Sequence, residues 1–345
     1  MTEHEPTNEQ APARTPRRRA PRRGVVLQNR DLAVLTALAE ARFLTPAAVE
    51  WLFYPWRERY KTYLEQRKTQ PALAWFPAAN VYRRLSALAG VVPPLLARMT
   101  RLSEQARAGP GRLEAVYTLA EAGAELVAET QGREFNTLWY ADGRRRSTRN
   151  LEHSVQIGVF YAALRAALEH SGLSLIGWQH DQQLAGRDAA HSGPSYDRVR
   201  VPGIQEPIAV LPDATCVLDG QRVFVEIDRG LTNLKSWGEK LRGFEAYRGS
   251  AALQARYGVA DFVVLVVSPT ESRQRRIAEE MLKVVRHATD RYRFVTADRV
   301  HPTSIRPAWR VVTAFSWERR QVVDRSVEVP GELRWGSAPL WRTAQ

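Results

Sequence analysis

Three acidic residues interrupt a segment that otherwise has the pattern of two β-strands. The segment LPDATCVLDGQRVFVEIDRG spans residues 211–230 and contains Asp213, Glu226 and Asp228. Its Asp219-Gly220 dipeptide is typical of a two-residue hairpin turn, and such a turn fixes the register between the two strands. With this turn, Asp213 faces Glu226 on the neighbouring strand. The segment therefore predicts two carboxylates directly opposite each other.

All three acids should lie on one face of the hairpin, because side chains along a strand alternate between faces. The other face is apolar and should belong to the core: Ala214, Cys216, Leu218, Val223, Val225 and Ile227. Opposite carboxylates have Cβ atoms only ~4.5–5.5 Å apart, and their repulsion destabilises the strand pair. A hard cation such as Mg²⁺ or Mn²⁺ would offset this repulsion, and so would a nearby lysine or arginine. Alternatively, water separates the acids at an exposed end of the hairpin. We favour a polar site.

Two further side chains could join these acids. Lys240 lies beside the apolar stripe of a helix predicted in NLKSWGEKLRGFEAY, so its ammonium group either reaches the acids or stays at the rim with its stem packed on Tyr247. His153 lies on a helix predicted in NLEHSVQIGVFYAALRAAL. It has no second histidine or cysteine at metal-ligand spacing, so we expect a packed, hydrogen-bonded histidine rather than a ligand.

The region from residue 29 to 130 has the order of a winged helix-turn-helix domain. Three helices are predicted in NRDLAVLTALAEARFLT, TPAAVEWLFY and AANVYRRLSALAG, with a looser insert before the third. Two β-like runs, PLLARMTRL and LEAVYTLAEAG, follow with a polar loop between them. The third helix of such a domain enters the major groove of DNA. The alternative is an ordinary helical subdomain with a solvated basic face.

The residues expected to contact DNA are polar or basic. Arginine and asparagine pair with guanine and adenine edges. On the third helix these are Asn80, Arg83 and Arg84, and on the hairpin they are Arg98 and Arg101. Arg17, Arg18 and Arg19 belong to a polar, proline-containing N-terminal segment that should be disordered. That segment is either an arm that contacts DNA phosphates or a solubilising tail.

Composition limits the class of protein. The chain has 345 residues, a net charge of +13 and a pI near 10.3, a balance that favours double-stranded DNA or another polyanion as partner. Its single cysteine excludes a disulfide framework. We see no signal peptide and no run that reaches the ~18–20 apolar residues of a membrane span, so we expect a cytoplasmic protein without membrane contact. A homodimer is plausible because winged-helix proteins often bind paired half-sites.

From residue 173 onward, strand and helix patterns alternate, which predicts an α/β fold with a mixed central sheet. In this setting the PDA of residues 212–214 and the VEID of residues 225–228 resemble the PD-(D/E)XK nuclease-like core. Together with the trailing KLRGFEAY and the N-terminal winged helix, the chain resembles the replication-relaxation family over roughly residues 30–300. That family comprises plasmid and mobile-element proteins linked to replication control and DNA relaxation.

The resemblance implies a restriction-endonuclease-like domain after the winged helix. We expect the following division of the chain: a disordered basic arm (1–28), a winged-helix DNA-binding domain (29–130), a charged linker (131–150), the PD-(D/E)XK nuclease-like domain (151–315) and a C-terminal extension (316–345).

The resemblance also implies roles for individual residues. Asp213 and Glu226 would hold Mg²⁺ or Mn²⁺, with Glu152 as a further ligand. The lysine of the motif should occupy position 228, where this chain has Asp228. Asp228 would then be a ligand or general base, and Lys240 would supply the missing ammonium group.

Two functions fit this pattern. The first is a sequence-reading DNA-binding protein that acts in replication control, mobilisation or regulation of a plasmid or mobile element, with a catalytically silent nuclease-like domain. The second is a Mg²⁺-dependent nuclease that nicks or cleaves DNA and is targeted by the winged helix. An RNA-binding or protein-interaction module has less support.

Overall fold

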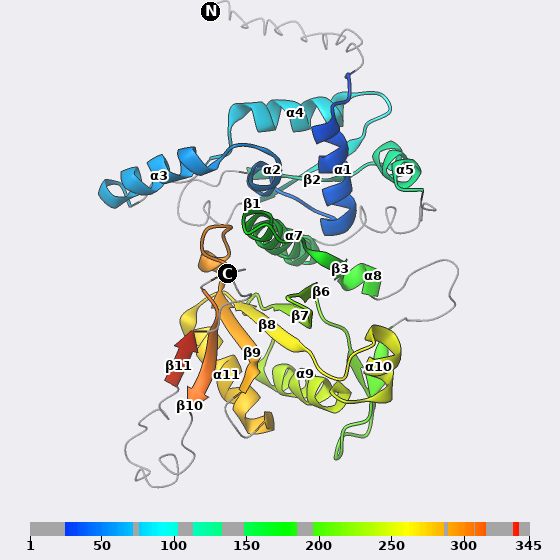
Figure 1. The fold of residues 1–345 in the computed structure, drawn as a ribbon, viewed down its shortest axis with the longest axis vertical. Coiled ribbons are helices and arrows are strands. Elements are labelled where there is room, and N and C mark those ends of the chain that lie inside the picture. Colours follow the sequence, from blue (N-terminus) through cyan, green and yellow to red (C-terminus); the bar gives the residue numbers. More distant parts are fainter. Residues whose placement is uncertain are drawn as a thin grey trace, which may run out of the picture.

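The computed structural model describes residues 25–71, 76–102, 113–132, 148–184, 196–285, 289–306, 308–314 and 334–337. Figure 1 shows a helical N-terminal part above a part built around a β-sheet, with helix α7 between them. Arg17, Arg18 and Arg19, most of the predicted arm, and residues 133–147 of the predicted linker lie outside the described residues.

The N-terminal part contains five helices and one hairpin among its described residues. They are α1 (Asn29–Ala41), α2 (Pro46–Phe53), α3 (Arg57–Thr69), α4 (Ala79–Gly90), β1 (Leu96–Leu102), β2 (Leu113–Leu119) and α5 (Glu121–Thr130). The start of α2 is fixed locally, because Thr45 caps the helix by accepting a hydrogen bond from the backbone N–H of Ala48 and Pro46 follows at the first position. The three predicted helices are confirmed as α1, α2 and α4.

Two expectations for this part are wrong. The insert expected to be looser forms the helix α3, which buries none of its residues and therefore shows no apolar periodicity. Pairs such as Lys61–Glu58 and Lys68–Glu65 run along its exposed surface. The second β-like run is too long, because the chain turns into helix α5 at Glu121.

Among its described residues, the second part is built on a mixed seven-stranded sheet with the order β11-β10-β9-β8-β7-β6-β3. Its strands are β3 (Ile176–His180), β6 (Ala214–Leu218), β7 (Gln221–Ile227), β8 (Val263–Ser268), β9 (Thr289–Thr296), β10 (Arg310–Ala314) and β11 (Arg334–Ser337). β7, β8 and β9 run parallel, and the outer pairs are antiparallel. The predicted α/β class with a mixed sheet is confirmed. The predicted C-terminal extension is not separate from this sheet, because β11 forms one of its edges.

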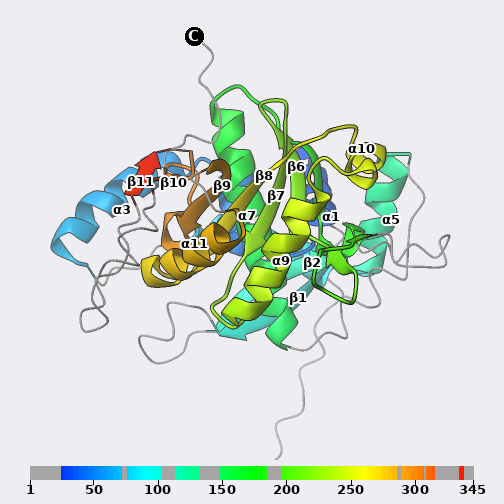
Figure 2. The same ribbon diagram turned by 90° about the horizontal axis from the view of Figure 1, so that it is seen from below.

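Helices cover both faces of the sheet. They are α7 (Thr148–His170), α8 (Asp181–Leu184), α9 (Leu234–Tyr247), α10 (Ala251–Tyr257) and α11 (Glu271–Val285). The other described elements are a small hairpin of β4 (Asp197–Val199) and β5 (Ile208–Val210) and a 3-10 turn (Ala297–Arg299). In Figure 2, α9 and α11 lie in front of the strands and α7 lies behind them. The sheet is therefore a middle layer between α9 with α11 and α7.

The predicted hairpin register is confirmed. Leu218 pairs with Gln221 and Thr215 pairs with Phe224, as the Asp219-Gly220 turn requires. The apolar face of this hairpin joins the core that contains α7, whereas Phe224 joins the core beneath α9 and α11.

Helix α7 joins the two parts through one continuous core. That core runs from Leu35 and Leu38 of α1 through Phe160 of α7 to Cys216 of β6. The approach is close at Gly158, where an added Cβ would lie 1.9 Å from the carbonyl oxygen of Phe43. The predicted boundary at residues 131–150 therefore separates the parts along the chain but not in their cores.

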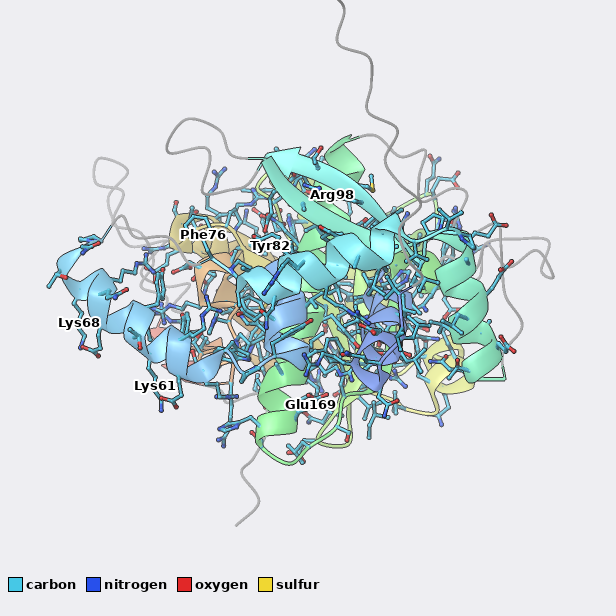
Figure 3. The ribbon with its side chains drawn as sticks, turned by 90° about the horizontal axis from the view of Figure 1, so that it is seen from above. Lys61, Lys68, Phe76, Tyr82, Arg98 and Glu169 are labelled. Carbon is cyan, nitrogen blue, oxygen red and sulfur yellow. The ribbon has the colours of Figure 1, made fainter. Side chains whose placement is uncertain are left out.

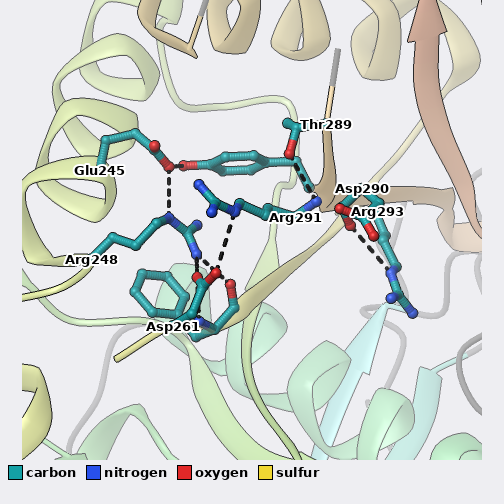
Figure 4. A network of polar contacts seen from close by, with 9 residues as sticks. Glu245, Arg248, Asp261, Thr289, Asp290, Arg291 and Arg293 are labelled. Carbon is teal, nitrogen blue, oxygen red and sulfur yellow. Dashed lines mark hydrogen bonds and ion pairs between the residues drawn. The ribbon is translucent and has the colours of Figure 1, made fainter. Parts of the chain in front are cut away.

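A polar network holds α9 against the sheet at the end remote from the hairpin's acids (Figure 4). The guanidinium of Arg248, of which 8% is exposed, donates to Glu245, Asp261 and the carbonyl oxygen of Phe262. Tyr292 of β9 donates to the same Glu245 carboxylate at 2.7 Å. The buried guanidinium is thus matched by two carboxylates, as burial of a charge requires.

Replacing Gly158 tests the close contact between α7 and the N-terminal part. We expect Gly158→Ala to lower the free energy of unfolding by about 1–3 kcal/mol, because the methyl group must push the backbone of Phe43 away. Gly238→Ala in α9 is the matched control: its Cβ would meet only a side-chain oxygen of Glu280 at 3.7 Å. Urea unfolding measures both. Equal stability of the two variants would contradict the close packing at Gly158.

Candidate functional site

The three acids predicted to converge line one cavity of about 290 Å³ at the C-terminal end of β7. His153 of α7 and Lys240 of α9 line the same cavity. Residues from both layers of helices therefore meet the end of the central hairpin.

Asp213 connects the hairpin to α7. Its Oδ2 accepts a hydrogen bond from the backbone N–H of Ile227 at 2.7 Å, and its Oδ1 lies 3.0 Å from Nε2 of His153. Burial opposes ionisation of Asp213, but the positive charges of Lys240 and His153 outweigh it and hold its pKa below the usual 3.8. The Asp213 carboxylate is thus kept charged inside the protein.

Glu226 is buried, with 2% of its surface exposed, and pairs with Lys240. Its Oε2 accepts a hydrogen bond from Nζ of Lys240, whereas its Oε1 has no hydrogen-bond partner among the described residues. Burial raises the pKa of Glu226 to about 8 in spite of the lysine, and the nearby Asp213 charge adds to the rise. The Lys240 side chain therefore reaches the acids, which is the first of the two alternatives predicted from the sequence.

Asp228 forms part of the cavity wall, and both of its carboxylate oxygens accept hydrogen bonds. Arg273 of α11 donates to both of its oxygens, at 2.7 and 3.1 Å, and the indole N–H of Trp237 and the backbone N–H of Gly230 complete its contacts at 3.2 and 3.1 Å. The carboxylate therefore fixes α9, α11 and the loop between β7 and α9 to the end of β7. No feature of the local sequence indicated Arg273, because it lies 45 residues from Asp228 in the chain.

The helix α7 contributes His153 rather than Glu152 to the cavity. His153 is hydrogen-bonded, as expected, but its partner is Asp213 and it lines the candidate site. Burial opposes protonation of His153, yet the Asp213 carboxylate raises its pKa above 6.5. Glu152, the predicted further metal ligand, does not line the cavity.

One feature of the carboxylates in the cavity suits a hard cation such as Mg²⁺. Glu226 Oε1 is a buried oxygen without a partner among the described residues, and Mg²⁺ is commonly held by one or two carboxylates with water at its other positions. Among the residues that the structure describes, no group of three or more His, Cys, Asp or Glu side chains is placed to hold a metal ion. The carboxylates that line the cavity are those of Asp213, Glu226 and Asp228.

Helix α4, which carries Asn80, Arg83 and Arg84, lies on the side of the N-terminal part that faces away from the sheet (Figure 1). Asn80 and Arg83 are exposed on α4, and Arg98 is exposed on β1 beside Tyr82 (Figure 3). Arg84 instead binds the buried Asp31 and donates to the carbonyl oxygen of Val26 at 2.8 Å. Arg101 pairs through its backbone with Glu114, and its side chain lies outside the described residues.

Comparison with protein families matches residues 35–263 to the family described as replication-relaxation. The match covers more than half of the 345 residues. The chain belongs to the replication-relaxation family. The match extends from within α1 to the start of β8, so every residue that lines the cavity falls inside it. Arg273 of α11, which binds Asp228, lies outside it. Neither a comparison with curated proteins nor one with solved structures gave a match.

In the described residues of this replication-relaxation protein, no helix is both long and apolar enough to cross a membrane.

Replacing Asp228 tests its role in the wall. We expect Asp228→Ala to lower the free energy of unfolding by about 3–5 kcal/mol, because it leaves the largely buried Arg273 guanidinium without its carboxylate. Removing both charges with Arg273→Met added should cost less than the sum of the single changes. The exposed Asp298 provides a control, Asp298→Ala, with an expected change within about 0.5 kcal/mol. Denaturant unfolding of the four variants checks this, and additive single effects would contradict the pairing.

Proposed function

We propose that this replication-relaxation protein binds double-stranded DNA through α4 and the β1–β2 hairpin, and that it acts in replication control, mobilisation or regulation of a plasmid or mobile element. The observation that carries the proposal is the division of α4 into two faces. Val81, Leu85 and Leu88 are buried, whereas Asn80 and Arg83 are exposed on the outer surface.

The arrangement of neighbouring elements supports a winged-helix reading. Leu44, between α1 and α2, forms an isolated antiparallel β-bridge with Tyr117 of β2, which joins the segment between these helices to the hairpin. Helix α4 then precedes the hairpin directly, as a recognition helix precedes a wing. In this reading α3 is an insertion between the second helix and the recognition helix.

Charge supports the choice of DNA as partner. The chain carries a net charge of +13. Arg83 is exposed on α4, and Arg98 is exposed on β1, the strand that follows α4. Arg84 ties α4 to Val26, so the described chain begins beside the proposed recognition helix. Arg17, Arg18 and Arg19 precede this segment in the sequence, and we propose that they contact phosphates of the same DNA.

Loss of an exposed base-contact residue should weaken binding. We expect Arg83→Ala and Asn80→Ala each to cost about 1–3 kcal/mol of binding free energy at the preferred site, with less effect on unrelated DNA. Arg276→Ala on α11 removes an equally exposed arginine from the other side of the molecule and serves as the control. Fluorescence anisotropy with the DNA upstream of the gene, at two salt concentrations, measures these effects. Equal losses for Arg83→Ala and Arg276→Ala would contradict recognition by α4.

A second candidate function is metal-dependent nicking of the bound DNA. The observation that favours it is the contact of Lys240 with Glu226 in the cavity that also contains Asp213. The lysine missing at position 228 is thereby supplied from α9. A divalent ion, when bound, would activate water for phosphodiester hydrolysis.

The chain's own residues have separate tasks in that chemistry. Asp213 and Glu226 would hold the ion, and Lys240 would bind the phosphate once the Glu226 carboxylate turns to the ion. His153 would keep Asp213 oriented through its hydrogen bond. Asp228 would act only through the wall that it holds in place with Arg273.

A plasmid relaxation assay separates the two candidates. Wild type with Mg²⁺ or Mn²⁺ should convert supercoiled plasmid to the open circle, whereas Asp213→Ala, Glu226→Ala and Lys240→Gln should each reduce the rate by at least tenfold. Arg276→Ala should retain the wild-type rate. Absence of conversion by wild type, with DNA binding intact, would exclude nicking of this plasmid and leave the DNA-binding function.

A further inference from the structure

A second, larger cleft lies where the N-terminal part meets the edge of the sheet. It has a volume of about 780 Å³ and is lined by residues of α1, α7, β3, α8, β7 and α10. Figure 1 shows α1 above β3 and α10 below it. The cleft contains Arg222, near the start of β7, whereas the acid cavity contains Glu226 and Asp228, at and just beyond the end of that strand. The two sites are therefore distinct.

Two of the three arginines that line this cleft are matched by acids. Arg165 lies 2.8 Å from Glu169 and 3.6 Å from Glu40. Arg256 binds both oxygens of Asp197, at 2.6 and 3.1 Å. These guanidinium groups have their charge neutralised within the fold.

Arg222 differs from the other two. No carboxylate among the described residues pairs with it. Its guanidinium lies 4.6 Å from the ring centre of Tyr257 and is 3.5 Å from the hydroxyl of Thr215. Its Nε is buried and has no hydrogen-bond partner in the part of the chain that the structure describes. A cation in this state favours an anionic ligand, because bidentate pairing with phosphate or carboxylate oxygens would satisfy its donors.

A second unsatisfied donor lies in the wall of the same cleft. Trp178 is 9% exposed, and its indole N–H has no hydrogen-bond partner among the described residues. Buried polar groups nearly always have partners, so an unsatisfied one is a marker of a missing acceptor. The side chains of Thr36, Ser174 and Gln179 add neutral hydrogen-bonding groups to the lining.

We propose that this cleft binds a phosphate-bearing small molecule of nucleotide size, with Arg222 as the phosphate contact. The volume falls in the range of about 300–1,000 Å³ of small-molecule sites and is far larger than a phosphate ion requires. The neutral groups of the lining contact the sugar and base, and the indole N–H of Trp178 donates to one of their acceptors. Because α1 and the sheet both contribute to the cleft, the ligand bridges the two parts of the protein.

Isothermal titration calorimetry with the full chain tests this site. The probes are AMP, ADP, GMP and GDP, with inorganic phosphate and adenosine as fragments. We expect at least one nucleotide to bind more tightly than either fragment and to raise the melting temperature. Arg222→Gln should weaken that binding at least tenfold. It should lower the melting temperature of the unliganded protein only slightly, because Arg222 forms no ion pair among the described residues and loses only its contacts with Tyr257 and Thr215. Trp178→Phe, which keeps an aromatic ring and removes the N–H, should also weaken binding.

Arg83→Gln on α4 is the control for attraction to the basic surface in general, and it should bind the nucleotide like wild type. No binding of any probe at millimolar concentration would overturn the proposal. Equal affinity for inorganic phosphate and nucleotide would overturn it as well, as would equal binding by Arg222→Gln and wild type or an equal loss in Arg83→Gln.

Discussion

The structure depends on a helix that is buried on nearly all sides. α7 packs against the N-terminal helices with one face and against the central sheet with another, so its buried residues include Val155, Ile157, Phe160, Tyr161 and Leu164. None of its residues from Leu151 to Leu168 is exposed, so this stretch has no solvent face. Burial of α7 therefore unites the two parts of the chain, and it also carries His153 to the end of the central hairpin.

The need to compensate buried charges explains which side chains lie at that end of the hairpin. Two carboxylates of the hairpin are nearly inaccessible, and taking them out of water is costly unless each has a partner. Arg273 matches Asp228, and Lys240 matches Glu226, from α11 and α9 respectively. The two pairs differ in how completely the carboxylate oxygens are hydrogen-bonded. The Asp228 contacts are complete, whereas Glu226 keeps one oxygen without a partner among the described residues. This difference separates a side chain that holds the wall from one that is available to a ligand.

The proposed DNA-binding surface and the acid cavity lie in different parts of the molecule, on either side of α7. Membership in the replication-relaxation family covers both, because the match extends from α1 to the start of β8. The exposed face of α4 carries Asn80 and Arg83, and the cavity is lined by the three carboxylates with His153 and Lys240. The arginine-lined cleft between the two parts is a third place where an anionic molecule could act, and its walls come from both.

The sequence by itself determined the features that arise from neighbours in the chain. The Asp219-Gly220 turn and the alternation of side chains fixed the hairpin register and placed Asp213, Glu226 and Asp228 together, because strand geometry has a period of two. Only the tertiary structure decided which side chains pair with those acids. His153 lies 60 residues from Asp213 and Arg273 lies 45 residues from Asp228, so no local pattern connects them. The helix α3 was not predicted from the sequence for a related reason. It buries none of its residues, and a pattern of burial is what makes a helix visible in a sequence.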